Sequence, residues 1–434
     1  MLSDVVKWLV PHCRPSFLCG KNMKRKIVLM TAAVMAMISC GIHEIGGNGE
    51  ESAGGGIWGG PAGGEQNGPG KLHTICYMTA LDYRKDYDWR SDQARGSVKC
   101  SLVVFADGTP LMKVPVGAAY EAGSDPDMHR IIGGNLYTDY STDSETVIKE
   151  NGVQVLRYHG PESLCGMEVI GEDVYTLGQS RNGSGFTFRK NGEIVLERDE
   201  GYVIGSLIND SDSLCFAFCE HIKTSDGSKI GRYYSSVNGR VHQVAVREDI
   251  KTVWDVLAAN DGAIYLASLT GASLPVVFIG DSMQSLQMPL GCSLKSCRLF
   301  KLENGVGAEG LCRHSNGMWF SVIWIDGMIR ASFPSEAISS LTADGDGVCC
   351  AMNPSRSGKS GKIYRSGELT DMPEEYSVIG AGSIKVIDGI LHVGLSSLNG
   401  RKPVVWKDGQ IDSLNVNGFI SSIWVESVSR SVFP

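Results

Sequence analysis

Two stretches of the sequence bring together the side chains that ligand binding and acid–base chemistry use. Stretch 82–92 mixes aromatic rings with charges of both signs, and further along the chain two carboxylates precede a histidine. Sugars and peptides present apolar faces beside polar edges, so rings next to carboxylate and guanidinium groups suit them. We predict a binding site that comprises Tyr83, Arg84, Asp86, Tyr87, Trp89, Arg90, Asp92, Asp125, Asp127 and His129. The alternative is that stretch 82–92 is a solvated insertion without a site.

The same carboxylates leave a second function open. Glycoside hydrolysis needs two carboxyl groups about 5–5.5 or 6.5–9.5 Å apart. A pair of this kind among Asp86, Asp92, Asp125 and Asp127 would make the protein a polysaccharide-acting hydrolase or lyase. Without such a pair it is a binding or scaffold protein for a glycan or a protein, which is our first hypothesis. A third interpretation, a structural partner in an envelope complex, predicts a large apolar surface patch.

Motifs for metals and cofactors are missing from the sequence. It contains no HExxH, no GxSxG, no CxxC pair and no cysteine–histidine cluster at zinc spacing. The run Asp344-Gly345-Asp346-Gly347 suits calcium or simply a tight turn. His221, like His129, is expected near a long polar loop. We predict no cofactor and no metal.

The elements that position these residues are short strands joined by a repeated turn. Asn-Gly and Asp-Gly pairs supply the positive φ angles of type I′ hairpins. Such turns recur at intervals of 44, 40, 47, 42, 46, 40 and 42 residues, a mean of 43. About that many residues make the four strands of one propeller blade. The turns are Asp107-Gly108, Asn151-Gly152, Asn191-Gly192, Asn238-Gly239, Gly280-Asp281, Asp326-Gly327, Ser366-Gly367 and Asp408-Gly409.

A second turn precedes seven of these, so each repeat contains two hairpins, with strands A–B and then C–D. The second turns are Gly133-Gly134, Gly171-Glu172-Asp173, Asn209-Asp210, Asn260-Asp261-Gly262, Asn304-Gly305, Asp344-Gly345 and Asp388-Gly389. In the third unit the strands are expected at 166–170, 174–177, 186–189 and 193–197. In the last unit they are expected at 383–387, 390–395, 403–406 and 410–414.

The two ends of the repeat region complement each other. Leu72–Asp82 is a B strand without an A strand before it, and Phe419–Ser427 is an A strand with no B, C or D after it. We predict an all-β fold, an eight-bladed β-propeller closed by the C-terminal strand, which removes the exposed sheet edges. Seven blades or an open solenoid are the alternatives. In a propeller the B–C and D–A loops share one face, which would bring stretches 82–92 and 125–129 together there.

The N-terminal segment carries an export pattern. Lys24-Arg25-Lys26 precedes the largely apolar run 27–37, which is too short to span a membrane, and Met37-Ile38-Ser39-Cys40 resembles a bacterial lipobox. We predict that Met23 is the true start of translation and that residues 1–22 result from a start assigned too far upstream. Residues 23–39 are then a signal peptide, and Cys40 is lipidated. The alternative is a signal peptide that is cleaved without lipidation. Residues 40–71 form a glycine-rich tether, and residues 72–434 form the propeller.

Three of the repeated turns carry a resemblance. Thr187–Gly192 and Val405–Gly409 are similar to the W-K-N-G hairpin of uncharacterised β-propeller lipoproteins of gut Gram-negative anaerobes, and Val147–Gly152 is a looser instance. The first has Phe-Arg where Trp would stand, and the second has Asp for Asn. The resemblance implies a lipoprotein of the outer membrane, on its periplasmic or its surface side. It marks a turn, and it implies no activity.

Charge and cysteine content limit the partners. The formal net charge is −8, and residues 1–39 hold six basic side chains against Asp4, so the remainder stands at −13. Such a body repels phosphate backbones, and we predict no nucleic acid partner, a monomeric fold and membrane contact through the Cys40 anchor alone. Apolar strand-like runs hold Cys215, Cys219, Cys312, Cys349 and Cys350, as expected of structural thiols. Whether Cys76 and Cys100 face each other in a disulfide stays open.

Overall fold

Strands and turns make up the part of the chain that the computed structural model describes. It comprises residues 72–83, 100–116, 129–141, 144–160, 162–181, 184–210, 213–223, 229–244, 249–259, 262–269, 271, 274–280, 282–345, 347–353, 361–373, 375–378, 383–397 and 402–429. Over these residues there is no helix, and therefore none with the length and apolar character that a membrane crossing requires. The predicted signal peptide, the lipidation site Cys40 and the tether lie outside the described residues.

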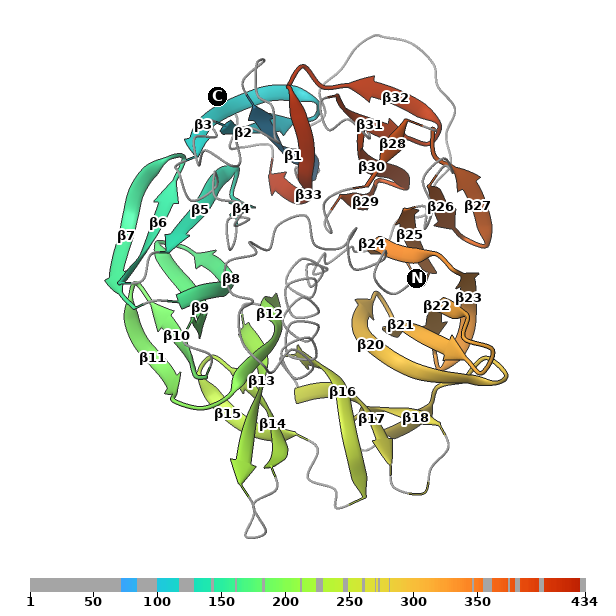
Figure 1. Ribbon diagram of the computed structural model, residues 1–434. Coiled ribbons are helices and arrows are strands. Elements are labelled where there is room, and N and C mark those ends of the chain that lie inside the picture. The colour runs from blue at the N-terminus through green and yellow to red at the C-terminus, as the bar shows by residue number, and fades with distance from the viewer. Residues whose placement is uncertain are drawn as a thin grey trace, which may run out of the picture.

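Eight antiparallel sheets form a ring around a common axis (Figure 1). Blade 1 contains β33 (Gly418–Ser429), β1 (Leu72–Tyr83), β2 (Cys100–Ala106) and β3 (Thr109–Val116). Blade 2 contains β4 (His129–Ile132), β5 (Asn135–Ser141), β6 (Glu145–Glu150) and β7 (Val153–His159). Blade 3 contains β8 (Glu162–Ile170), β9 (Asp173–Ser180), β10 (Phe186–Lys190) and β11 (Glu193–Arg198). Blade 4 contains β12 (Tyr202–Asp210), β13 (Ser213–Lys223), β14 (Lys229–Val237) and β15 (Arg240–Val244).

The remaining blades repeat this order. Blade 5 contains β16 (Ile250–Ala259), β17 (Gly262–Leu269), β18 (Pro275–Ile279) and β19 (Ser282–Ser285). Blade 6 contains β20 (Cys292–Leu302), β21 (Gly305–His314), β22 (Trp319–Ile325) and β23 (Met328–Pro334). Blade 7 contains β24 (Ala337–Asp344), β25 (Gly347–Asn353), β26 (Lys362–Arg365) and β27 (Glu368–Asp371). In blade 8 the A strand is split into β28 (Tyr376–Ser377) and β29 (Ile384–Ile387), which both pair with β30 (Ile390–Ser397), followed by β31 (Pro403–Lys407) and β32 (Gln410–Ser413). The prediction of an eight-bladed propeller is confirmed.

The C-terminal strand closes the ring as predicted. β33 pairs with β1 in register from Leu72↔Ser429 to Asp82↔Gly418, with one bulge. Near the end of β33, the Glu426 carboxylate accepts hydrogen bonds from the backbone N–H groups of Gly133 (2.8 Å) and Gly134 (2.9 Å) in blade 2. The closing strand therefore ties its own blade to the next one as well as completing its sheet.

The asparagine of the repeated turn has a structural task beyond a positive φ. Asn191 has a φ of 50°. Its side-chain Oδ1 accepts a hydrogen bond from the N–H of Val174 (2.8 Å), and its own N–H donates to the carbonyl of Val174 (2.8 Å). Asn151 binds Leu136 and Asn238 binds Leu214 with the same pair of contacts. The C–D turn of each of these blades thus holds the start of its B strand, which explains why Asn or Asp is needed there.

The glycine of the same turn lets neighbouring blades approach closely. A Cβ on Gly152 would lie 2.9 Å from Cγ1 of Val114, in the D strand of blade 1. A Cβ on Gly239 would lie 2.9 Å from Cγ1 of Val195, in the D strand of blade 3, and one on Gly327 would lie 2.6 Å from the carbonyl oxygen of Ser285 in blade 5. At these three positions a Cβ would force the neighbouring blade to shift, so in these blades the turn also sets the packing of one blade on the previous one.

Substitutions of Asn191 separate its two roles. Asn191→Gly keeps the positive φ but removes the hydrogen bond to Val174, and we expect the free energy of unfolding to fall by about 1 kcal/mol. Asn191→Ala removes the same hydrogen bond, and its Cβ in the left-handed region costs about 1–2 kcal/mol relative to glycine, less the entropy that alanine spares in the unfolded chain. In urea denaturation, the free energy of unfolding should decrease in the order wild type, Asn191→Gly, Asn191→Ala. Equal stability of the two variants would contradict this account.

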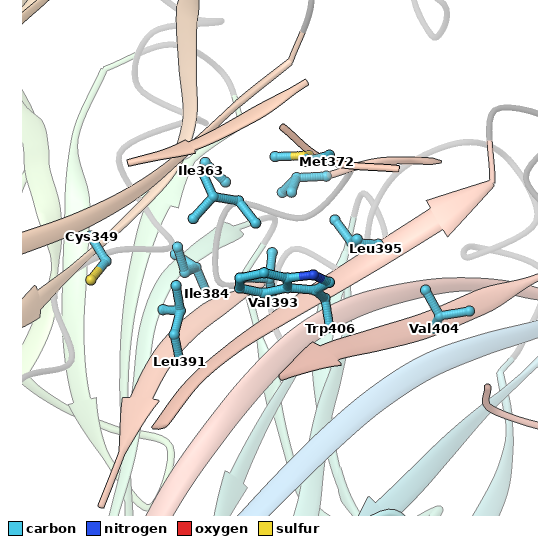
Figure 2. Close-up of a cluster of buried hydrophobic side chains, with 11 residues drawn as sticks. Cys349, Ile363, Met372, Ile384, Leu391, Val393, Leu395, Val404 and Trp406 are labelled. Carbon is cyan, nitrogen blue, oxygen red and sulfur yellow. The ribbon is translucent and has the colours of Figure 1, made fainter. Parts of the chain in front are cut away.

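The core lies between blades, where one sheet packs on the next. Figure 2 shows the cluster between blades 7 and 8, in which the Trp406 ring lies beside Val393. The buried members are Cys349, Ala351, Ile363, Met372, Val378, Ile384, Leu391, Val393, Leu395, Val404 and Trp406. An aromatic residue stands two positions before the turn in four more blades and is buried each time, at Phe105, Phe278, Trp324 and Tyr364. The sequence analysis missed this wider pattern, including Trp324-Ile325-Asp326-Gly327.

Two details of the sequence analysis are corrected by strand register. Cys76 lies beside the Asp107 turn and is a free, buried thiol, whereas Cys100 pairs with Tyr83 at the opposite end of the β1–β2 hairpin. A disulfide between Cys76 and Cys100 is therefore excluded, and burial raises the pKa of the Cys76 thiol to about 12. In blade 4, Asn209 and Asp210 pair with Leu214 and Ser213, so both belong to the A strand and do not form the predicted A–B turn.

Candidate functional site

The predicted site residues belong to two connections that start from the closure seam. β1 ends at Tyr83 and β2 begins at Cys100, while β3 ends at Val116 and β4 begins at His129. Both connections leave the same end of their blades, on the face that carries the B–C and D–A loops, which we call the loop face. The structure describes the backbone of Tyr83 and the whole of His129; the other eight residues, Arg84, Asp86, Tyr87, Trp89, Arg90, Asp92, Asp125 and Asp127, lie outside the described residues. His221 lies in β13.

His129 belongs to a cluster of polar side chains that the sequence does not reveal. Its Nε2 lies 3.0 Å from Oγ1 of Thr79 and 3.1 Å from Oγ of Ser421, and these two oxygens are 2.9 Å apart. The Ser421 hydroxyl also donates to the backbone carbonyl of Thr79 (3.1 Å). The three groups come from β4, β1 and β33, so the cluster joins the first strand, the last strand and the second blade. We call it the seam cluster.

Burial sets the charge of the seam cluster. Thr79 is fully buried, His129 is half-buried, and the rings of His129 and Trp424 meet edge to face with centroids 6.3 Å apart. Desolvation lowers the pKa of His129 from its ordinary value of 6.5 to about 4, so the imidazole is neutral at neutral pH. A neutral imidazole can accept a proton from a hydroxyl, which is the first requirement of nucleophilic catalysis. Among the described residues no carboxylate hydrogen-bonds to this ring, so the orienting acid of a Ser-His-Asp arrangement is missing from this part of the chain.

The bulge at Ser421 in β33 has counterparts in the A strands of other blades. Register shifts occur between Leu164 and Gly166, between Leu294 and Ser296, and between Ile338 and Ser340. Bulges redirect a side chain or a backbone carbonyl and are frequent beside functional sites. In blade 3 the bulged residue is Cys165, whose carbonyl accepts a hydrogen bond from Oγ of Ser206 in blade 4 (2.8 Å). The bulges therefore serve the contacts between neighbouring blades.

Two buried carboxylates of the described residues are engaged in contacts between blades or within one blade. The Asp255 carboxylate in β16 accepts a hydrogen bond from the N–H of Leu299 in β20 (2.6 Å), and burial raises its pKa to about 7. Glu162 forms a buried ion pair with Arg189 (2.8 Å), whose guanidinium also lies over the Tyr158 ring. Asp255 and Glu162 are therefore both engaged by partners within the protein. The carboxylates predicted for glycoside hydrolysis, Asp86, Asp92, Asp125 and Asp127, lie outside the described residues.

The acidic turn of blade 7 has a protein partner. The Asp344 carboxylate accepts a hydrogen bond from Nε of Arg365 (3.0 Å), and Arg365 reaches on to Asp408 (3.2 Å) and to the carbonyl of Gly389 (2.6 Å) in blade 8. Between the two readings of this run, the contacts favour the structural turn. The described residues contain no group of three or more histidine, cysteine or carboxylate side chains able to hold a metal.

Comparison with known proteins identifies no family for this chain. No protein-family model and no curated protein matches the sequence. Similar solved structures include the dihydro-heme d1 dehydrogenase NirN in complex with DHE, with a TM-score of 0.45, 11% identity and coverage of 80% of this chain and 74% of that one. The WD40 domain of SCAP from fission yeast has a TM-score of 0.40, 10% identity and coverage of 84% and 96%. A prolyl endopeptidase structure has a TM-score of 0.39, 12% identity and coverage of 70% of this chain, which spans 50% of that protein.

The class of protein is thus defined by its own strand order: it is an eight-bladed β-propeller with its first blade completed by its last strand. The activities of the similar structures are not transferred to this chain.

Proposed function

We propose that the protein is a lipid-anchored binding or scaffold propeller of the bacterial envelope, with a glycan or protein ligand held on the loop face at blades 1 and 2. The observation that carries the proposal is the seam cluster. It joins β1, whose end leads into the first of these connections, to β4, which follows the second one, and to the closing strand β33. A rigid base under long connections is the usual arrangement of binding loops.

The chemistry of the described residues favours binding over catalysis. The histidine of the seam cluster is held by two hydroxyls, and the buried carboxylates pair with cations or backbone groups. The ligand contacts would come from Trp89, Tyr87, Arg84 and their neighbours. Aromatic and guanidinium groups at such a loop suit a sugar ring or a peptide side chain.

The proposed location rests on the N-terminal segment. A lipobox ending at Cys40, followed by a glycine-rich stretch, fits a protein held at the outer membrane by acyl chains, on its periplasmic or cell-surface side. Two or more chains make such anchoring stable. The expectation that the chain resembles β-propeller lipoproteins of gut bacteria is part of this proposal.

A binding screen with the full chain tests the function. The detergent-solubilised protein is applied to a glycan array and, in parallel, used as bait for envelope proteins of its host. We expect a defined ligand whose signal Trp89→Ala abolishes, because the stacking surface is lost. The matched control is Trp58→Ala, a tryptophan of the tether, which should retain the signal.

Each part of the proposal has its own contrary result. No ligand in either screen would contradict the binding function, and a ligand that Trp89→Ala still binds would contradict its placement on the first-blade loop. The anchor is tested in the same cells. Cys40→Ser should move the chain from the membrane pellet to the soluble fraction and prevent incorporation of a palmitate analogue.

A further inference from the structure

A second feature of the loop face lies on blade 6. Leu290, in the connection that leads into β20, is 96% exposed, while Met318 and Trp319, where the B–C loop enters β22, are 42% and 36% exposed. Single exposed apolar residues are normal on a protein surface. Here three large ones stand on two loops that hydrogen-bond to each other, and exposed apolar residues that cluster mark interaction sites.

Hydrogen bonds join the two loops and hold them in one shape. The N–H of Ser315 donates to the carbonyl of Gly291 (3.0 Å), and the N–H of His314 donates to the carbonyl of Met318 (2.8 Å). Within the B–C loop, Oδ1 of Asn316 accepts a hydrogen bond from the N–H of Met318 (3.0 Å). A Cβ on Gly291 would lie only 2.8 Å from Nε2 of His314, which shows how closely the loops approach. A surface organised in advance loses little entropy when a partner binds.

A cation without a counter-ion flanks the apolar residues. Arg313 is exposed and stands directly opposite Trp319 in the β21–β22 pair, with its guanidinium carbon 5.5 Å from the centre of the Trp319 ring. Among the described residues no carboxylate forms an ion pair with Arg313, although the chain carries a net charge of −8. A guanidinium stacked on a ring keeps its N–H groups free for a carboxylate. Tryptophan and arginine are also the residues most enriched in binding hot spots.

We propose that blade 6 docks a polypeptide partner through Leu290, Met318, Trp319 and Arg313. The segment that fits brings an apolar side chain next to an Asp or Glu. A purely apolar occupant would leave Arg313 unpaired, and a glycan stacked on Trp319 would leave Leu290 and Met318 in water. The inference rests on the proposed binding function but names a partner class and a surface separate from the first-blade loop.

Peptide selection tests this surface directly. The full chain is panned against a phage-displayed library of random linear peptides, with counter-selection against the double variant Leu290→Ser, Trp319→Ala. We expect enriched peptides with an acidic residue beside an aromatic or aliphatic one. Synthetic copies should bind with Kd weakened about tenfold or more by Leu290→Ser and by Arg313→Glu. Exchanging the acidic residue of the peptide for Lys should restore binding to the Arg313→Glu variant.

Control variants distinguish loss of the binding surface from loss of the folded structure. The Leu290 side chain is almost fully exposed, so Leu290→Ser should leave Tm unchanged. Leu369→Ser, which alters a leucine 51% exposed on β27 of blade 7, should leave both Kd and Tm unchanged. Trp89→Ala should not affect these peptides, so failure of this proposal and failure of the first-blade site can be told apart.

Four outcomes would overturn the proposal. They are the absence of enrichment over the double variant, enriched peptides without an acidic residue, a glycan ligand lost on Trp319→Ala, and self-association of the protein that Leu290→Ser abolishes.

Discussion

Ending the chain after Asn417 should abolish the cooperative unfolding of the whole propeller. The truncation removes β33, whose Ile420 and Ile423 are each 1% exposed and pack with Met78 and Phe105 of blade 1. Loss of one buried Ile side chain typically costs 2–5 kcal/mol, roughly, and a domain has only about 5–15 kcal/mol in total. The truncation also opens the edge of β1 and breaks both the seam cluster and the Glu426 contacts with blade 2. We expect no thermal transition in near-UV circular dichroism.

A shorter truncation and a peptide make this test specific. Ending the chain after Ser429 removes only residues that follow β33 and should leave Tm unchanged. Adding a synthetic peptide of residues 418–429 to the longer truncation should restore the transition in a concentration-dependent way, because the strand would bind in trans. If the chain that ends at Asn417 melts like the full protein, ring closure does not stabilise the fold.

The strand order could be predicted because its determinants are local. Seven of the eight C–D turns have a residue with positive φ followed by a glycine, as at Asn191-Gly192 and Asp408-Gly409, and this pair can be read from the sequence; blade 5 has Gly280-Asp281 instead. The closure was also predictable, since an A strand is missing at Leu72 and a spare one is present at Phe419. Strands A to D of the third and last units lie where predicted, each within a few residues of its expected ends.

Contacts between distant strands could not be predicted in the same way. Thr79, His129 and Ser421 meet only because the ring closes and because a bulge turns Ser421 toward the other two. Whether Cys76 and Cys100 face each other could not be decided from the sequence for a related reason: their separation depends on the register that the Asp107 turn imposes on β1 and β2. The patch on blade 6 depends on two loops that touch, and the sequence gives no sign of their contact. The buried aromatic residues before the turns were a signal that a closer reading would have found.

Acid should destabilise the protein through His129, and the effect is separable from that of other groups. The pKa of His129 is about 4 in the folded protein and near 6.5 when the chain is unfolded. As the pH falls from 6.5 to 4, the unfolded chain binds a proton that the folded protein does not, so the free energy of unfolding decreases. The full difference of about 2.5 pKa units corresponds to about 3 kcal/mol, and below pH 4 this group contributes no further loss.

Asp255 acts in the opposite direction, which dictates the measurement. Its pKa is raised to about 7 in the folded protein, so as the pH falls the folded protein binds this proton before the unfolded chain does. The contribution of Asp255 to the free energy of unfolding therefore increases as the pH falls from 7 toward 3.8. The wild-type curve alone can therefore be nearly flat. The informative quantity is the difference in free energy of unfolding between wild type and His129→Gln, because the amide keeps a hydrogen-bonding group near the Thr79 and Ser421 hydroxyls without titrating. Between pH 7 and pH 4 the wild-type protein should lose about 3 kcal/mol of free energy of unfolding relative to the variant. Urea titrations at the two pH values measure this. A difference that does not change with pH would show that the imidazole titrates normally and that the seam cluster is open to water.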